Sequence, residues 1–315
     1  MNNESNIKFS RLAWAALVYN LAVILWGAWV RITGSGAGCG DHWPTCGGEI
    51  IPRSPGVETI IEFSHRLTSG LTLIFGIILV VIARRVFAKG HRARTAAWVT
   101  LVFILLEAAL GAILVLKGLV AKDTSSVRAV VVALHLVNTL GLVGGGALTA
   151  WWSVERPRSF GTGVRRGSLL ALVTGLVLVG ATGAITALGD TLFPVPVVEG
   201  SGLIATIVND ISMAQHILVR LRIVHPLLAL CVGLGILVWG LSVERTTQSG
   251  ALGYLANALV WSTALQMMLG VLNVILHAPG WMQLVHLLVA DLVWVAAILT
   301  CVEAKDQNII QPVSS

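Results

Sequence analysis

Eight hydrophobic stretches constrain the fold of this chain more than any other feature of its sequence. Each is roughly 20 residues long, which is the length that an α-helix needs to cross about 30 Å of hydrocarbon. Charged residues make up only 11% of the chain, whereas soluble domains carry roughly 25%. We therefore expect an all-α polytopic membrane protein with eight transmembrane helices. The stretches lie at about 12–32, 62–83, 95–116, 128–151, 167–188, 218–241, 251–275 and 282–303.

The positions of Lys and Arg predict how these helices are oriented. An even number of spans places both termini on one side, and 13 of the 21 Lys and Arg residues then fall on that side. Because cytoplasmic loops are enriched in Lys and Arg, we expect both termini in the cytoplasm. The loop between the first two spans then faces outward. So does the 189–217 connection, in which we expect a short helix on the membrane surface.

The first residues of the chain indicate which membrane the protein occupies. The sequence MNNESNIKFSR leads directly into a full-length span, so we expect neither a cleaved signal peptide nor an organellar transit segment. This favours the bacterial cytoplasmic membrane, with membrane lipid as the surrounding partner. No basic stretch alternates with aromatic residues, and we therefore expect no nucleic-acid binding.

The two halves of the chain look like copies of one unit. Residues 106–116 (LEAALGAILVL) align with 265–276 (LQMMLGVLNVIL), and residues 27–33 (GAWVRIT) align with 180–186 (GATGAIT). Glycines in these segments are expected to let helices approach closely. The glycines concerned are Gly27, Gly111, Gly180 and Gly270.

Both copies run in the same direction across the membrane. We therefore expect two tandem four-helix bundles related by a pseudo-two-fold axis along the membrane normal. The N-terminal half is residues 12–151, and the C-terminal half is residues 167–303. A cytoplasmic linker at 152–166 joins them.

Four of the eight histidines lie inside the predicted spans, near the outer ends of the even-numbered ones. They are His65, His135, His225 and His286. Ionisable side chains are costly in the membrane and are usually functional there. Each half supplies one pair, and two imidazoles at one depth can ligate a haem iron from opposite faces. A zinc site, a proton relay and four hydrogen-bonded core histidines are the alternatives. We expect the other four to be solvated loop histidines: His42, His91, His216 and His277.

Charged residues near the first histidine also fit a haem site. Glu62 precedes His65 by three residues, so both lie on one helix face. Three arginines at outer helix ends are candidates for binding haem propionates, since guanidinium groups suit carboxylates: Arg31, Arg66 and Arg222. Snorkelling to the membrane interface is the alternative for each of them. The acids Glu107 and Asp291 are either structural or part of a proton path.

These features together resemble the haem A synthase family over about residues 12–303. The resemblance rests on GAWVRITGSG with a following WP, on EFSHR around His65, on an HL pair at 135–136 and on the duplicated unit. It implies a haem-dependent oxidoreductase that converts the C8 methyl of haem O to a formyl group, giving haem A for cytochrome oxidase. It also implies partners, namely a haem O synthase and an unidentified electron donor, and it leaves open whether the chain forms a homo-oligomer.

The same resemblance implies roles for individual residues. His65 and His135 would hold the substrate haem O, and His225 and His286 would hold a haem b cofactor. Glu62, Cys39 and Cys46 would be catalytic.

Two positions depart from the family pattern. Pro226 follows His225 where the family has arginine, so Arg222 is expected to stand in for it. Residues 189–217 lack the second cysteine pair of some members, and Cys231 and Cys301 are expected to be packing residues. A dihaem b-type electron carrier and a haem transporter or chaperone are the rival functions.

The outer loop at 34–48 reads GSGAGCGDHWPTCGG and holds Cys39 and Cys46. A cysteine pair on the oxidising side tends to form a disulfide, whereas with His42 it would make only a sparse zinc site. The disulfide is either a structural staple or a thiol–disulfide centre that reacts at the haem. We expect it to be exposed in a flexible loop, where it would be readily reduced.

Overall fold

The hydrophobic stretches form long helices, as their length and composition require. The computed structural model describes residues 3–155, 160–161, 166–194, 212 and 214–308. The helices are α1 (Asn3–Ile32), α2 (Val57–Val86), α3 (Arg92–Leu116), α4 (Ser126–Trp151), α5 (Arg166–Leu192), α7 (Ile217–Arg220), α8 (Val224–Thr246), α9 (Ala251–Ile275) and α10 (Gly280–Asn308). Two short 3-10 helices are η1 (Ser35–Ala37) and η2 (Leu221–Ile223). Strand β1 (Phe160–Gly161) pairs antiparallel with β2 (Thr247–Ser249).

Within the described residues, 8 helical segments are long and apolar enough to cross a membrane. The sixth is the continuous run of α7, η2 and α8, from Ile217 to Arg245. The prediction of an all-helical protein with eight spans is therefore confirmed. The surface helix expected within 189–217 falls largely on 195–211 and 213, outside the described residues.

Most predicted helix ends agree with the structure within a few residues, but α1 and α2 begin earlier than expected. Helix α1 begins at Asn3, and its polar first turns carry an ion pair of 2.6 Å between Lys8 and Glu4. Helix α2 begins at Val57, where Thr59 donates a hydrogen bond of 2.7 Å to the Gly38 carbonyl. Local polar contacts extend both helices beyond their hydrophobic stretches.

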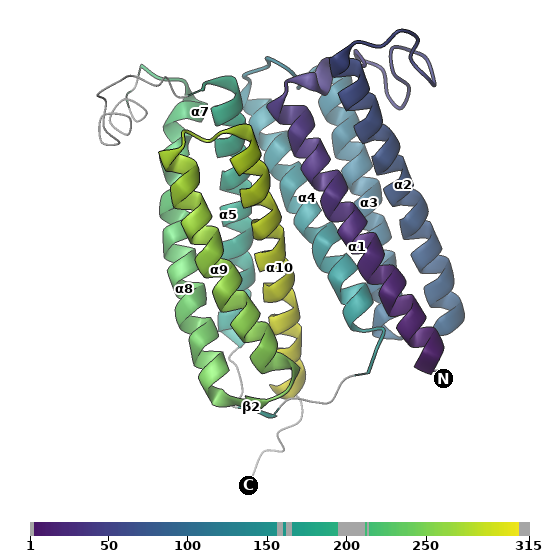
Figure 1. Cartoon of the computed structure of the whole chain (residues 1–315), viewed down its shortest axis with the longest axis vertical. Coiled ribbons are helices and arrows are strands. Elements are labelled where there is room, and N and C mark those ends of the chain that lie inside the picture. Colours follow the sequence, from purple (N-terminus) through teal and green to yellow (C-terminus); the bar gives the residue numbers. More distant parts are fainter. Residues whose placement is uncertain (1–2, 156–159, 162–165, 195–211, 213, 309–315) are drawn as a thin grey trace.

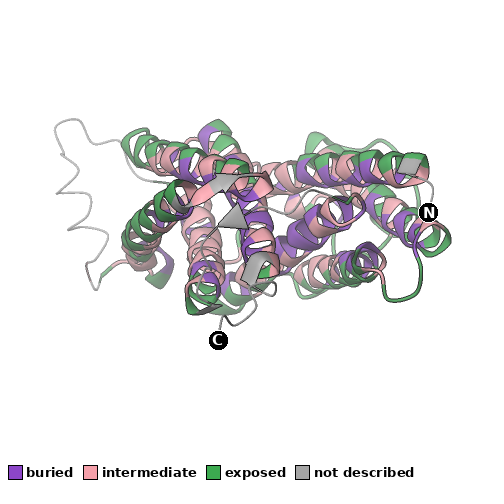
Figure 2. Ribbon diagram, turned by 90° about the horizontal axis from the view of Figure 1, so that it is seen from below, coloured by how far each residue is buried: buried purple, intermediate pink, exposed green. Residues whose placement is uncertain are grey.

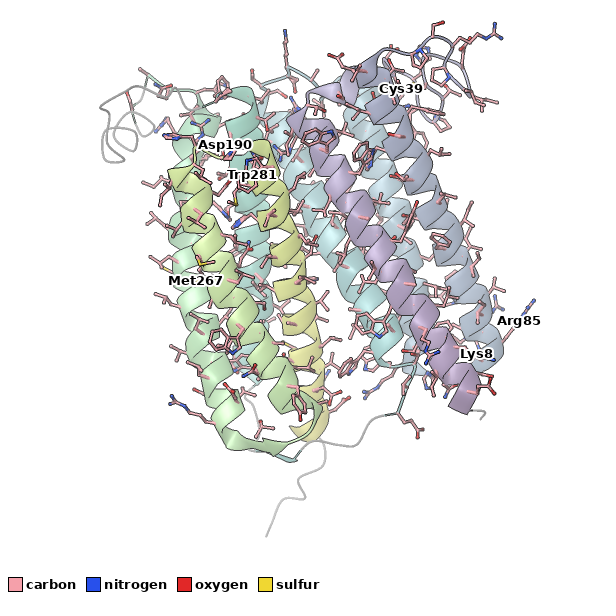
Figure 3. The ribbon with its side chains drawn as sticks, in the orientation of Figure 1. Lys8, Cys39, Arg85, Asp190, Met267 and Trp281 are labelled. Atoms are coloured by element: carbon pink, nitrogen blue, oxygen red, sulfur yellow. A yellow bond between two sulfur atoms is a disulfide. The ribbon has the colours of Figure 1, made fainter. Side chains whose placement is uncertain are left out.

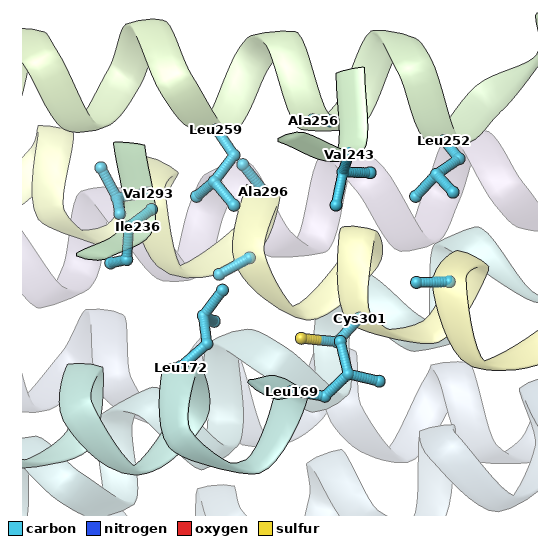
Figure 4. Packing of buried hydrophobic residues seen from close by; sticks show 12 residues of the cluster. Leu169, Leu172, Ile236, Val243, Leu252, Ala256, Leu259, Val293, Ala296 and Cys301 are labelled. Atoms are coloured by element: carbon cyan, nitrogen blue, oxygen red, sulfur yellow. The ribbon is translucent and has the colours of Figure 1, made fainter. Parts of the chain in front are cut away.

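Helices α1 to α4 lie side by side as one group, and α5 to α10 form a second group (Figure 1). The two groups meet along a buried apolar cluster to which both contribute, including Leu140, Val143 and Trp294. The Trp294 indole N–H donates a 2.6 Å hydrogen bond to the Leu140 carbonyl across this contact. Each group also has its own core; that of the second group is drawn in Figure 4.

Exposed residues lie on the outside of the bundle, while buried residues lie between the helices (Figure 2). Large side chains such as Val18, Leu67 and Trp261 are 60% or more exposed. A surface of this kind suits a protein whose surrounding solvent is lipid. Figure 3 places Lys8 and Arg85 at one end of the bundle, and Cys39, Asp190 and Trp281 at the other. We call the end that carries Cys39 the loop end.

Candidate functional site

The four histidines within the spans occupy equivalent places in their helices. Each lies six to nine residues after the first residue of α2, α4, α7 or α10. At a rise of 1.5 Å per residue this is roughly 9–14 Å along the helix. They are His65, His135, His225 and His286. The sequence therefore positions two pairs at similar depths, one pair in each group of helices.

The second pair has a separation that suits one shared metal ion. The ring centres of His225 and His286 lie 6.5 Å apart, with the ring planes at 89°. Two imidazoles that share one metal ion through bonds of about 2 Å have ring centres roughly 6–6.5 Å apart. The pair can therefore accommodate an iron atom between its rings.

Polar contacts fix both rings of this second pair. His225 Nδ1 lies 3.2 Å from the Val179 carbonyl oxygen, which selects the tautomer with hydrogen on Nδ1 and leaves Nε2 free to ligate. His286 Nε2 lies 3.1 Å from the Gln266 side-chain nitrogen. That amide occupies the ligating nitrogen of His286, so it would have to give way to a metal ion.

The first pair differs in its partners. His65 packs against α1, where a Cβ added to Gly27 would come within 2.9 Å of the ring. His135 Nδ1 lies 2.8 Å from Glu107 Oε1, but the angle at the ring nitrogen is too bent for a hydrogen bond. The His135 side chain remains 29% accessible although its Nδ1 is buried. The accessible surface thus belongs to the rest of the ring, which carries Nε2.

The glycines around these rings correct the alignment made from the sequence. A Cβ at Gly183 would lie 2.9 Å from the His225 ring, just as one at Gly27 would meet His65. Gly180, which the alignment matched with Gly27, instead faces Leu140 of α4. The match was wrong by three residues, about one helical turn. It followed the letters GAxxxIT that both segments share, and not the glycine that packs against the histidine. Gly111 has nothing within 4 Å of an added Cβ, so the close approach expected there was also wrong.

The disulfide between Cys39 and Cys46 is present, with a Cα–Cα distance of 4.4 Å. The two residues are only 1% and 2% exposed. The expectation of an exposed disulfide in a flexible loop was therefore wrong. The loop folds back on itself: Cys46 and Glu49 exchange two backbone hydrogen bonds, and Gly47 N–H donates to the Cys39 carbonyl. Because both sulfurs are bonded to each other, the zinc alternative is also excluded.

Glu62 and Arg66 anchor this loop to α2. The buried Glu62 carboxylate accepts hydrogen bonds from the Cys39 N–H at 2.7 Å and from the Arg66 guanidinium at 2.5 and 3.1 Å. Arg66 in turn donates to the carbonyls of His42 and Thr45, each at 2.6 Å. These charge-assisted bonds hold the loop over the end of the first group of helices.

The other two propionate candidates also have protein partners. Arg31 of α1 donates to the Ala187 carbonyl at 2.6 Å, to the Thr191 hydroxyl and to the Gln283 side chain at 2.9 Å. It therefore ties α1 to α5 and α10. Arg222 forms an ion pair of 2.8 Å with Asp190, a residue that the sequence analysis did not single out.

Asp190 and Gln283 were missed because their partners are far away in the sequence. No local spacing relates Asp190 to Arg222, and the predicted helix end at 188 placed Asp190 in a loop. The sequence does place His135, Asn138 and Thr139 at helical spacing on one face of α4, which could have predicted a polar cluster there.

Two of the four loop histidines cap helices, so the expectation of freely solvated rings was wrong for them. His91 accepts a hydrogen bond from the Ala93 N–H at 3.2 Å, and its ring stacks on Phe87. Partial burial lowers the pKa of His91, and nearby Glu155 opposes this shift. His216 caps α7 in the same way.

The residues present fit haem better than a bare metal ion. Among the described residues, no three His, Cys, Asp or Glu side chains gather to bind a metal. The paired histidines offer two ligands per site, and an iron porphyrin requires only two from the protein. Glycine on the first helix of each half gives one ring of each pair room, and buried ring nitrogens without hydrogen-bond partners remain at His65, His135 and His286.

Comparison with known proteins identifies the family of the chain. The sequence profile of the COX15-CtaA family, described as cytochrome oxidase assembly protein, matches residues 10–298. A "Heme A synthase" of Bacillus mycoides is 40% identical over 110 residues, which are 34% of this chain and 35% of that relative.

Two longer matches come from two strains of Thermus thermophilus. Both proteins are named "Protoheme IX farnesyltransferase", and they are 46% and 45% identical to this chain over 305 residues. The match covers 95% of this chain but 49% of each relative. The chain therefore spans about half the length of these curated relatives.

Proposed function

Since the chain belongs to the COX15-CtaA family of cytochrome oxidase assembly proteins, we propose that it is a haem A synthase. Its substrate is haem O, whose C8 methyl it oxidises to a formyl group for cytochrome oxidase. The N-terminal half holds the substrate between His65 and His135. The C-terminal half holds a haem b cofactor between His225 and His286.

The observation that carries this proposal is the repeated histidine pair at one depth in two helix groups. The 6.5 Å separation of the His225 and His286 rings supports an iron between them. Oxidation of a methyl to a formyl group removes four electrons and adds one oxygen atom, which is chemistry that haem iron supplies and side chains do not. The protein's own part is to hold both haems, orient them and shield them from water.

The anchored outer loop supports a role for Glu62, Cys39 and Cys46 at the substrate half. The sequence predicts all three to be catalytic, and that remains a prediction. The contacts of the Glu62 carboxylate with the Cys39 N–H and with Arg66 favour a positioning role, in which Glu62 keeps the loop closed over the haem. A direct role would require Glu62 to release these partners.

Farnesyl transfer is a second activity that the names of the Thermus relatives raise. Prenyl diphosphates bind through divalent cations, which grouped carboxylates hold. The COX15-CtaA profile covers residues 10–298 of this chain, whereas the chain spans only 49% of each Thermus relative. We therefore assign oxidation to this chain and propose that a haem O synthase supplies the substrate, which would avoid release of an insoluble haem.

The positions of Lys and Arg support a location in a bacterial cytoplasmic membrane with both termini in the cytoplasm. The loop end and the haem sites then lie near the outer face. A haem b held by His225 and His286 would carry electrons between the substrate half and an electron donor or acceptor outside the chain.

The proposal is tested by supplying haem O to the purified protein in lipid vesicles and identifying the haems by mass spectrometry. We expect the hydroxylated intermediate and haem A to accumulate. Haem b alone, with haem O unchanged, would favour a dihaem electron carrier. A single exchangeable haem without any oxidised product would favour a haem transporter or chaperone.

A further inference from the structure

Three side chains from one face of α4 surround the carboxylate of Glu107. Asn138 donates to Oε2 at 2.5 Å, Thr139 donates to Oε1 at 2.6 Å, and His135 Nδ1 lies 2.8 Å from Oε1. Asn138 and Thr139 are both buried. The sequence spacing of i, i+3 and i+4 explains why all three reach a single residue of α3.

The partners of Glu107 suit a group that accepts hydrogen bonds. The Asn138 amide nitrogen also donates to the Phe103 carbonyl at 2.9 Å, which fixes its N–H groups toward α3. The Thr139 hydroxyl lies within reach of two acceptors, Glu107 and the His135 carbonyl. Oε2 thus accepts from Asn138, and Oε1 accepts from Thr139 when the single hydroxyl hydrogen of Thr139 points toward α3.

The equivalent place in the C-terminal half is built differently. There Gln266 faces His286, and the residues three and four positions after His286 are Val289 and Ala290. Neither of these side chains can donate a hydrogen bond. A carboxylate at position 266 would therefore lack the donors that surround Glu107, which explains why a neutral amide stands there.

We propose that Glu107 is a positioning residue that makes His135 a more strongly donating iron ligand than His286, its counterpart in the C-terminal half. The inference rests on the proposed binding of haem between His65 and His135. The carboxylate oxygen lies 2.8 Å from His135 Nδ1, and its negative charge favours the tautomer with hydrogen on Nδ1, which leaves Nε2 for the metal. It also raises the basicity of the ligand, as an outer carboxylate does for metal-bound histidines.

A negative partner on the ligand stabilises ferric over ferrous iron and lowers the reduction potential. The two haem sites would then differ, although each has two histidine ligands. Iron on the substrate side would be the easier to oxidise, and iron in the C-terminal half would remain the better electron acceptor. This difference favours electron flow from the substrate half to the cofactor half.

The test replaces Glu107 with glutamine, which keeps the shape and removes the charge. The purified protein is loaded with haem B or haem O, and each site is titrated with reductant while its optical spectrum is followed. We expect Glu107→Gln to weaken ferric-haem binding at the first site by about 10–100-fold. If its ferric-over-ferrous preference falls tenfold, the potential rises by about 59 mV.

Thr139 provides a milder variant of the same site. Thr139→Val, which removes one donor but keeps the carboxylate, should shift the first potential in the same direction as Glu107→Gln but by less.

The outcomes separate this inference from the proposed function. If both haems bind and Glu107→Gln leaves the potential and spectrum of the first site unchanged, the inference is overturned while the haem sites stand. If His65→Ala keeps the first haem, the site itself is wrongly assigned and the proposed function fails with it. A Glu107→Gln protein that binds only the second haem supports the positioning role if the Thr139→Val protein still binds part of the first haem. A Thr139→Val protein without any first-site haem contradicts the role.

Discussion

Glu62 shows how one buried charge can control access to a disulfide. Its carboxylate binds the Cys39 N–H and the Arg66 guanidinium, and hydrogen bonds to charged groups contribute about 1.5–3 kcal/mol each. We predict that Glu62→Gln speeds reduction of the Cys39–Cys46 disulfide roughly 10–100-fold, since every 1.4 kcal/mol is tenfold. The rate is measured by alkylating the freed thiols and quantifying the alkylated protein by mass spectrometry. Glu58→Gln, exposed on the same helix, is the control, and equal rates in both variants would contradict the anchoring role.

Gly38 lets the same loop lie directly on the backbone of α2. A Cβ at this position would come within 2.5 Å of the Glu58 carbonyl group, which cannot move without disturbing the helix. We predict that Gly38→Ala destabilises the protein by about 1–3 kcal/mol, as overpacking does. Gly36→Ala is the matched control, because its Cβ would be 3.5 Å from Val120. Thermal unfolding in detergent should separate the two variants, and identical curves would show that the loop adapts freely.

At the scale of elements, α1 and α5 provide corresponding walls for the two histidine pairs. Gly27 lies against His65 and Gly183 lies against His225. We predict that Gly27→Ala loses the haem of the N-terminal half and that Gly183→Ala loses that of the C-terminal half. Gly70→Ala on α2 and Gly235→Ala on α8, where an added Cβ meets nothing within 4 Å, should keep both haems. Haem content per protein is the measurement, and loss of both haems in one glycine variant would argue against separate sites.

The start of α3 carries a pH-dependent cap. Neutral His91 accepts the Ala93 N–H, and burial lowers the pKa of His91 below its ordinary value of 6.5. The unfolded segment therefore takes up a proton first, so the cap stabilises α3 fully above about pH 6.5 and is lost as pH falls through the lowered pKa. The protection of the first amides of α3 against hydrogen exchange, measured relative to unstructured amides, should fall over this range. His91→Asn, which caps without titrating, should keep this protection constant. The same loss of protection in His91→Asn would contradict the cap.

Hydrophobic length predicted the elements well, and tertiary contacts explain what it missed. The eight spans follow from their apolar length, so α9 was placed at its observed ends. The early start of α2 was missed because contacts with the outer loop stabilise its first turn. The histidines stood out because such residues are rare in spans. Their partners could not be paired without knowing that α3 faces α4, and Glu107 therefore stayed unassigned.

At the scale of the whole molecule, the two helix groups are joined by a small number of polar contacts as well as an apolar seam. Arg31 links α1 to α5 and α10 near the loop end, and Trp151 of α4 donates to Glu303 of α10 at 2.7 Å. These contacts fix one half relative to the other, which the proposed electron transfer between two haems requires. The pseudo-two-fold axis expected from the repeat remains a prediction.

The central claim is that the two halves hold different haems, with the substrate in the first and the cofactor in the second. Haem analysis of the wild type beside His65→Ala and His225→Ala, each supplied with haem O, tests it most directly. We predict that His65→Ala keeps haem b but no longer retains haem O, and that His225→Ala retains haem O unconverted and lacks haem b. Neither variant should form haem A. Formation of haem A at the wild-type level by either variant, or loss of the same haem from both, would contradict the account.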